Sequence, residues 1–216
     1  MTIQDVFASI QHGTYAPVYL FCPGKLPRAR EASFEPILAE QCIEAVVNAT
    51  VDPVNRDFAY AAYYADETAV GSIVMDAQTY PFLTDRRVVF VRNAEKYNSE
   101  TGAGVMLDYL AAPSESTILL LLANKIDKRT KFYKACKKVG EIVECPGLSE
   151  SEVMSWLNQE VAKRDKSIDG NAARALIDRT GTHLSDAQNA LSLVMHYVGE
   201  EISRIGLADV EAACAD

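Results

Sequence analysis

The sequence lacks the features that would place it in a membrane or in an oxidising compartment. Its apolar runs, such as 118–123, are far too short to cross a bilayer, and its start has no basic region followed by an apolar stretch. The five cysteines are odd in number and form no C-x-x-C pair, so neither a disulfide framework nor a zinc site is predicted. We therefore expect a soluble cytoplasmic protein with reduced, buried thiols and no membrane contact.

A surplus of basic residues is also missing. The formal charge of -9 argues against non-specific binding of nucleic acid over the whole surface, because that affinity comes from Lys and Arg on phosphates. One local cluster holds seven of the 21 basic residues: Lys125, Lys128, Arg129, Lys131, Lys134, Lys137 and Lys138. Such a run is either a solvated face or a surface for DNA or an acidic partner. Any contact with DNA must be local or shared with partner proteins.

No complete nucleotide-binding motif is present. The segment Cys22-Pro23-Gly24-Lys25-Leu26 follows the first predicted strand, where a phosphate loop would stand. A working G-x-x-x-x-G-K-[ST] loop needs glycines around the phosphates and a hydroxyl for magnesium, whereas here one glycine remains and Leu26 replaces the hydroxyl. The predicted strand 88–91 ends in Arg92-Asn93 and not in a metal-binding Asp. We therefore expect no ATP hydrolysis, no catalytic residue and no cofactor.

Two further motifs are weak. The tetrapeptide Asn124-Lys125-Ile126-Asp127 matches the N-K-x-D that reads guanine in GTPases, but the phosphate loop is absent and the D-x-x-G at 178–181 comes in the wrong order. The favoured alternative is a polar strand end that leads into a basic helix. The three histidines have no Cys, Asp or Glu neighbours at ligand spacing, so no metal is expected.

The sequence does contain strands that alternate with helices up to Pro146-Gly147. The predicted strands are 18–22, 58–64, 88–91, 117–123 and 142–143. Residues 26–47 are predicted to be helical, as one helix with a kink at Pro36 or as two helices. The other predicted helices are one capped by Thr2, one capped by Asp66, and two over 105–111 and 130–139. This alternation predicts a three-layer parallel α/β domain over 1–146. Residues 147–216 are predicted to form a small helical bundle, with capping boxes at Ser149–Glu152 and Ser185–Gln188.

The stretch 78–93, QTYPFLTDRRVVFVRN, joins an apolar pair to a strand that is predicted to be buried on both faces. Phe82 and Leu83 are expected at the end of a helix, before a polar turn over 84–86. Two large apolar residues beside such a turn are either part of the core or an exposed anchor for a partner.

Taken in order, these segments resemble the delta subunit of the bacterial DNA polymerase III clamp loader over nearly the whole chain. The most specific segments are Pro81-Phe82 with Asp85-Arg86-Arg87, the run 127–134 (DKRTKFYK) and 207–210 (LADV). The resemblance implies an AAA+-like module without ATPase function, followed by a helical lid, in a non-catalytic subunit of the polymerase III holoenzyme. It also implies that Phe82 and Leu83 insert into a pocket of the ring-shaped sliding clamp, the beta subunit, and open it for loading onto DNA during replication.

The partners implied by the resemblance are the sliding clamp, the other loader subunits (gamma/tau and delta prime) and primer–template DNA. Candidate contacts to DNA or to a partner are Lys125, Lys128, Arg129, Lys131 and Lys134.

Three departures from the family pattern stand out. Segment 24–34 lacks the usual acidic, leucine-rich start, and Ala190, Ser192 and Leu193 stand where charged residues are common. The family's helical collar domain has no counterpart, so we expect a truncated or naturally short relative that forms no stable loader pentamer. Two alternatives remain: a small P-loop-like NTPase or nucleotide kinase with a degenerate phosphate loop, and an inert scaffold for other subunits.

Overall fold

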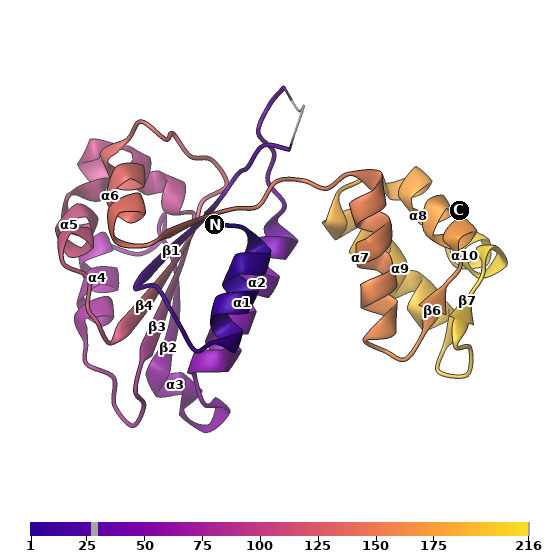
Figure 1. Ribbon diagram of the computed structural model, residues 1–216, viewed down its shortest axis with the longest axis horizontal. Helices are drawn as coiled ribbons and strands as arrows, with labels where there is room; N and C mark the ends of the chain where they lie inside the picture. Colours follow the sequence, from indigo (N-terminus) through magenta and orange to yellow (C-terminus); the bar gives the residue numbers. More distant parts are fainter. Residues whose placement is uncertain (27–29, 216) are drawn as a thin grey trace. The chain divides into compact units, whose positions relative to one another are not determined.

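The computed structural model describes residues 1–26 and 30–215, with only the backbone described at 100–102. These residues form two compact units, Met1–Pro146 and Gly147–Asp216 (Figure 1). The first unit contains a five-stranded sheet with helices on both faces, and the second is mainly helical.

All five strands of the first unit are parallel, in the order β2-β3-β4-β1-β5. Their bounds are β1 Val18–Cys22, β2 Tyr60–Tyr64, β3 Arg87–Arg92, β4 Thr117–Leu122 and β5 Glu141–Glu144. Every residue of β1 and β4 is buried, and so are the four central residues of β3. Both faces of these strands are covered, which explains their unbroken apolar runs. The predicted parallel α/β fold is confirmed.

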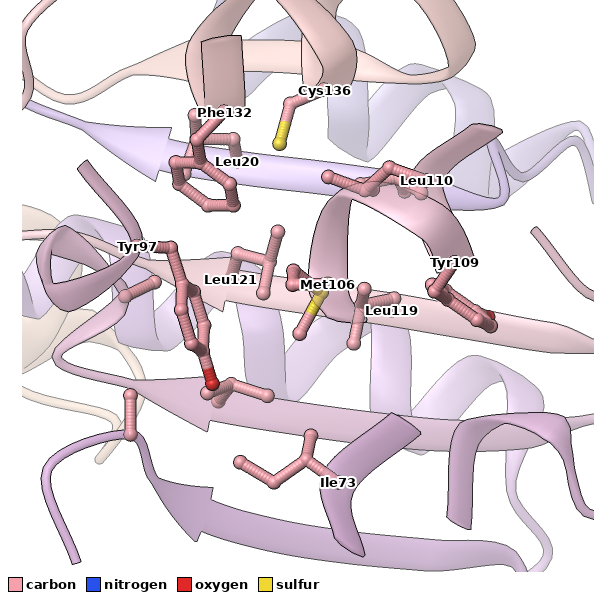
Figure 2. Packing of buried hydrophobic residues seen from close by; sticks show 14 of the residues in the cluster. Leu20, Ile73, Tyr97, Met106, Tyr109, Leu110, Leu119, Leu121, Phe132 and Cys136 are labelled. Carbon is pink, nitrogen blue, oxygen red and sulfur yellow. The ribbon is translucent and has the colours of Figure 1, made fainter. Parts of the chain in front are cut away.

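Two helical layers cover the sheet. Helices α4 (Val70–Gln78), α5 (Glu100–Ala111) and α6 (Lys131–Val139) lie on one face, and α1 (Ile3–Gln11) and α2 (Pro36–Thr50) lie on the other. Strand side chains alternate between the layers, as the pleat requires. Figure 2 shows the first layer, in which Ile73, Met106, Leu110 and Phe132 pack over strand residues Leu20, Leu119 and Leu121. The fold therefore has three layers.

The structure corrects three local predictions. Helix α2 begins at Pro36, because the first residue of a helix needs no N–H for the helical hydrogen bonds. The prediction of a helix that starts at Leu26 was therefore wrong. Gly24 and Ser33, on either side of that position, form an antiparallel bridge. Residues 27–29 of that predicted helix lie outside the described residues. The cap of α4 is Ala69, and Asp66 accepts a hydrogen bond from Asn93 Nδ2 at 2.8 Å.

The third correction concerns the start of β2. The short helix η1 (Pro53–Asn55) runs into α3 (Arg56–Ala59), so that Phe58 and Ala59 are helical and β2 begins only at Tyr60. A second short helix, η2 (Ala94–Asn98), follows β3. Both short helices shape the loops at the two ends of the sheet.

The second unit packs α7 (Glu150–Ala162), α8 (Gly170–Thr180), α9 (Leu184–Val198) and α10 (Leu207–Ala213). The predicted capping box at α7 is confirmed, because Ser149 and Glu152 bond each other's backbone N–H groups. The second box was wrong, since α9 starts at Leu184 after His183. The prediction of helices alone was also wrong, because β6 (Ser167–Ile168) and β7 (Arg204–Ile205) pair in parallel.

Within the part of the chain that the structure describes, no helix combines the length and the apolar character needed to span a bilayer.

Candidate functional site

The turn between α4 and β3, residues 79–86, carries the apolar pair and is called the tip below. Helix α4 ends at Gln78, where Thr79 adopts an extended conformation and donates its hydroxyl to the Met75 carbonyl at 2.9 Å. Pro81, which has no N–H to continue a helix, follows and is buried. Phe82 and Leu83 therefore lie in the turn beyond the helix and not at its end as predicted.

Both side chains of the pair face solvent. Phe82 is 67% exposed and Leu83 is 65% exposed, and Tyr80 beside them is also exposed. The alternative that the pair packs into the domain core is therefore wrong. An exposed group of large apolar side chains is uncommon on a folded surface and marks a candidate contact with a partner.

The backbone of the tip is strained and held by side chains. Leu83 has φ of +61°, in the left-handed region that residues with a Cβ rarely adopt. Asn55 Nδ2 of η1 donates to the Leu83 carbonyl at 3.5 Å, and Thr84 Oγ1 donates to the Arg86 carbonyl at 3.0 Å. Such a conformation costs on the order of 1–3 kcal/mol and persists only when its surroundings impose it.

Arg87, the first residue of β3, braces the base of the tip. Its guanidinium pairs with the carboxylate of Asp76 on α4 and donates to the Phe58 carbonyl of α3 at 2.6 Å. Asp76 also accepts a hydrogen bond from the Tyr63 hydroxyl at 3.1 Å, and burial together with this carboxylate raises the pKa of Tyr63. This brace could not be predicted from the sequence, because nothing local in the Asp85-Arg86-Arg87 segment indicates the partner of either arginine.

The segment that follows β1, where a phosphate loop would stand, lies at the carboxyl ends of the parallel strands, opposite the tip. Its groups make contacts within the protein. The N–H of Gly24 donates to the Ser33 carbonyl at 3.0 Å, and a Cβ on Gly24 would lie 2.9 Å from atoms of Glu144 and Pro146. Glu144 in turn pairs with Lys128. The Gly24 amide, which could face a phosphate, is thus engaged within the protein.

The ends of β3 and β4 are likewise bonded to each other. Asn124 donates its backbone N–H and its Nδ2 to the Glu95 carboxylate at 3.0 and 3.2 Å. Asp127 accepts bonds from Arg129, which lower the pKa of Asp127 to about 2. Asn124 and Asp127 of the N-K-x-D segment therefore make local contacts at a strand end that leads into α6. No group of three or more His, Cys, Asp or Glu suited to a metal occurs among the described residues.

The basic run is divided by the structure into two sets. Helix α6 buries Phe132, Tyr133 and Cys136, so its lysines are exposed on the opposite side: Lys131, Lys134, Lys137 and Lys138. Lys128 and Arg129 in the preceding loop pair with Glu144 and Asp127, and Lys125 is exposed. The exposed lysines of α6 form the basic face referred to below.

The parallel order β2-β3-β4-β1-β5 and the flanking helices define an AAA+-like fold. Solved structures with this fold include the Thermotoga maritima RuvB Holliday junction branch migration motor, at 12% identity and a TM-score of 0.58 over 98% of this chain and 67% of RuvB. Domain III of the Thermotoga maritima replication initiation protein DnaA matches at 11% identity and a TM-score of 0.56, over 98% of this chain and 89% of that domain.

Within this class, the chain belongs to the family of the DNA polymerase III delta subunit, whose family model matches residues 34–146. DNA polymerase III subunit delta of Bacillus subtilis (strain 168) is 27% identical over 98% of this chain and 60% of its own length. The solved Bacillus subtilis DNA clamp loader delta protein is 25% identical, with a TM-score of 0.66 over 99% of this chain and 62% of that protein. The chain thus spans about three fifths of the length of these two delta proteins.

Proposed function

We propose that this chain binds a sliding clamp through Phe82 and Leu83 and helps to open it, as the clamp-engaging part of a replicative clamp loader. The observation that carries the proposal is the exposure of both side chains on a braced turn, in a chain of the delta-subunit family. Apolar anchors of this kind dominate the affinity of many interfaces, and burying the pair in a partner's pocket contributes on the order of 2–4 kcal/mol.

The brace supports a binding role. A contact residue that is already fixed in its bound conformation loses less conformational entropy when the partner arrives. Asn55, Asp76 and Arg87 hold the backbone on both sides of the pair. The side chains of Phe82 and Leu83 are nevertheless exposed and do not pack into the core. The strain at Leu83 is consistent with a conformation kept for an external partner.

We further propose that the chain does not hydrolyse ATP. Phosphoryl transfer needs a backbone cradle and a metal ligand. Here the Gly24 amide donates to the Ser33 carbonyl, Leu26 stands where the magnesium-binding hydroxyl would be, and strand β3 ends in Arg92. These contacts disfavour the alternative of a P-loop-like NTPase or nucleotide kinase.

The implied partners are the other loader subunits and primer–template DNA. The basic face on α6 is proposed to contact DNA phosphates in the assembled loader, because it concentrates positive charge on a chain whose formal charge is -9. Changing Lys134 and Lys137 to Glu should weaken DNA binding by the assembled loader and flatten its salt dependence. If the DNA affinity of the variant depends on salt as steeply as that of the unaltered loader, the basic face does not contact DNA and is only a solvated surface.

The direct test is a binding measurement between this chain and the sliding clamp of the same organism. The double variant Phe82→Ala/Leu83→Ala should weaken binding by about 30- to 1,000-fold, the equivalent of the contribution estimated above. A matched control is Leu193→Ala/Tyr197→Ala, which removes two exposed apolar side chains of α9 in the other unit. Equal affinities of the tip variant and the unaltered chain would reject Phe82 and Leu83 as the anchor.

Calorimetry separates this function from the enzyme alternative. Titration with ATP or GTP in the presence of Mg²⁺ should give no measurable heat of binding. Tight binding of either nucleotide would contradict the non-hydrolysing role, whereas clamp binding would exclude an inert scaffold.

A further inference from the structure

Two more apolar side chains lie next to the tip on a separate segment. Val54 of η1 is 87% exposed and Phe58 of α3 is 54% exposed. The segment that carries them, η1 and α3, precedes β2, and the tip precedes β3. Because β2 and β3 are adjacent and parallel, both segments stand at the amino edge of the sheet (Figure 1).

Hydrogen bonds join the two segments directly. Asn55, the neighbour of Val54, donates its side-chain amide to the carbonyl of Leu83. The carbonyl of Phe58 accepts a hydrogen bond from Arg87 at the base of the tip. The two pairs of apolar residues therefore belong to one surface, and their backbones are fixed relative to each other.

The local structure holds Val54 and Phe58 outward. Asp52 caps η1 by accepting the Val54 N–H at 2.8 Å, and Pro53 fixes the first residue of that helix. The next residue after Phe58, Ala59, is buried against the sheet and sets the orientation of the short helix. Neither Val54 nor Phe58 is among the residues that build the cores of the first unit.

The area of the proposed interface also calls for more than the tip. A stable protein–protein interface buries about 800 Å² on each partner, whereas one large aromatic side chain supplies roughly 150–250 Å². Phe82 and Leu83 alone fall well short of that area. The same two segments also carry exposed charged residues, Asp52, Arg56, Asp57 and Asp85, and an interface with an apolar centre needs such polar residues for its rim.

We infer that Val54 and Phe58 form a second apolar contact for the sliding clamp, beside Phe82 and Leu83. This inference rests on the proposed function and adds to it a segment that lies 24 or more residues earlier in the chain. The occupant is the clamp because the surface is continuous with the tip through Asn55 and Arg87.

The test compares clamp binding by four proteins: the unaltered chain, Val54→Ala/Phe58→Ala, Phe82→Ala/Leu83→Ala and the α9 control Leu193→Ala/Tyr197→Ala. We expect Val54→Ala/Phe58→Ala to weaken binding by about 5- to 30-fold, the range for one or two moderate contact residues. The control should bind like the unaltered chain. Thermal unfolding of each variant establishes that it is folded, and Val54→Asp, at a site 87% exposed, replaces the double variant if that one unfolds.

A further arm asks whether Val54 and Phe58 contact the clamp or only position the tip. Val54→Ala/Phe58→Ala is combined with Phe82→Ala, and the loss in affinity should persist if the contact is direct. Disappearance of the effect in the Phe82→Ala background would overturn the inference.

The outcomes separate this inference from the proposed function. If Phe82→Ala/Leu83→Ala loses affinity and Val54→Ala/Phe58→Ala does not, the second contact is rejected and the proposed function stands. If the unaltered chain fails to bind the clamp, the proposed function is rejected and the second contact with it.

Discussion

Arg87 forms an ion pair with Asp76 that connects the first residue of β3 to the last turn of α4. The tip is the loop between these two elements. The side chains are only 15% and 17% exposed, so the pair lies in a medium of lower dielectric than the surface pairs of this protein. The second nitrogen of the guanidinium holds the Phe58 carbonyl. One arginine therefore connects three elements around the candidate site.

Replacing Arg87 should destabilise the first unit. Arg87→Met leaves the Asp76 carboxylate and the Phe58 carbonyl without this partner, and we expect the free energy of unfolding to fall by about 2–4 kcal/mol. Arg174→Met is the matched control, because Arg174 and Glu150 form a pair whose side chains are 53% and 64% exposed. Its removal should cost less than about 1 kcal/mol. Urea unfolding measures both, and equal costs would mean that Arg87 does not act as a brace.

Leu83→Gly should separate stability from binding. Glycine adopts a φ of +61° without strain, but it also makes the unfolded chain more flexible, so the two effects nearly cancel. We expect the free energy of unfolding to change by less than about 1 kcal/mol, whereas clamp affinity should fall because the side chain is gone. A loss of several kcal/mol would show that Leu83 supports the fold.

Gly140 should tolerate no side chain. A Cβ at this position would lie 2.1 Å from the Val18 carbonyl oxygen, which belongs to the backbone of β1 and has no room to move. We expect Gly140→Ala to lower the free energy of unfolding by about 3 kcal/mol or more. Gly104→Ala on the exposed side of α5 meets nothing within 4 Å and should stabilise the fold by about 0.5–1 kcal/mol. Chemical unfolding of both variants tests this contrast.

The buried cysteines should be unreactive and should make the fold sensitive to alkali. Burial raises the pKa of Cys22 and Cys42 from 9.0 to about 12, so their thiolates are scarce at pH 8. Stability from these thiols is fully present below pH 9, where the unfolded thiols keep their protons, and is lost as the pH rises toward 12. A thiol reagent at pH 8 should label the partly exposed Cys214 first and label Cys22 only on unfolding. Rapid labelling of Cys22 in the folded chain would contradict this.

Much of the fold follows from patterns within single segments. The unbroken apolar run of β4 predicts a strand covered on both faces, and the Ser149–Glu152 spacing predicts the start of α7; both are confirmed. Where such local signals competed, the prediction failed. Asp66 was predicted to cap a helix because its side chain can accept a hydrogen bond from the backbone. In the structure its carboxylate instead accepts a hydrogen bond from Asn93, which is distant in sequence.

The candidate site could be predicted only in part for the same reason. The residues of the tip stand out in the sequence as a large apolar pair between a helix and a strand. Only the structure shows that Pro81 is buried while Phe82 and Leu83 beside it are exposed. Nothing in the local sequence relates them to Val54, because that neighbour arrives through the pairing of β2 with β3.

The sequence by itself thus determined the strands of the first unit, most of the helices and the loss of a complete phosphate loop, since each depends on residues a few positions apart. Only the tertiary structure decided which apolar residues are buried, which arginine braces the tip and which segments share a surface. These properties depend on contacts between residues far apart in the chain, and side-chain periodicity carries no information about such contacts.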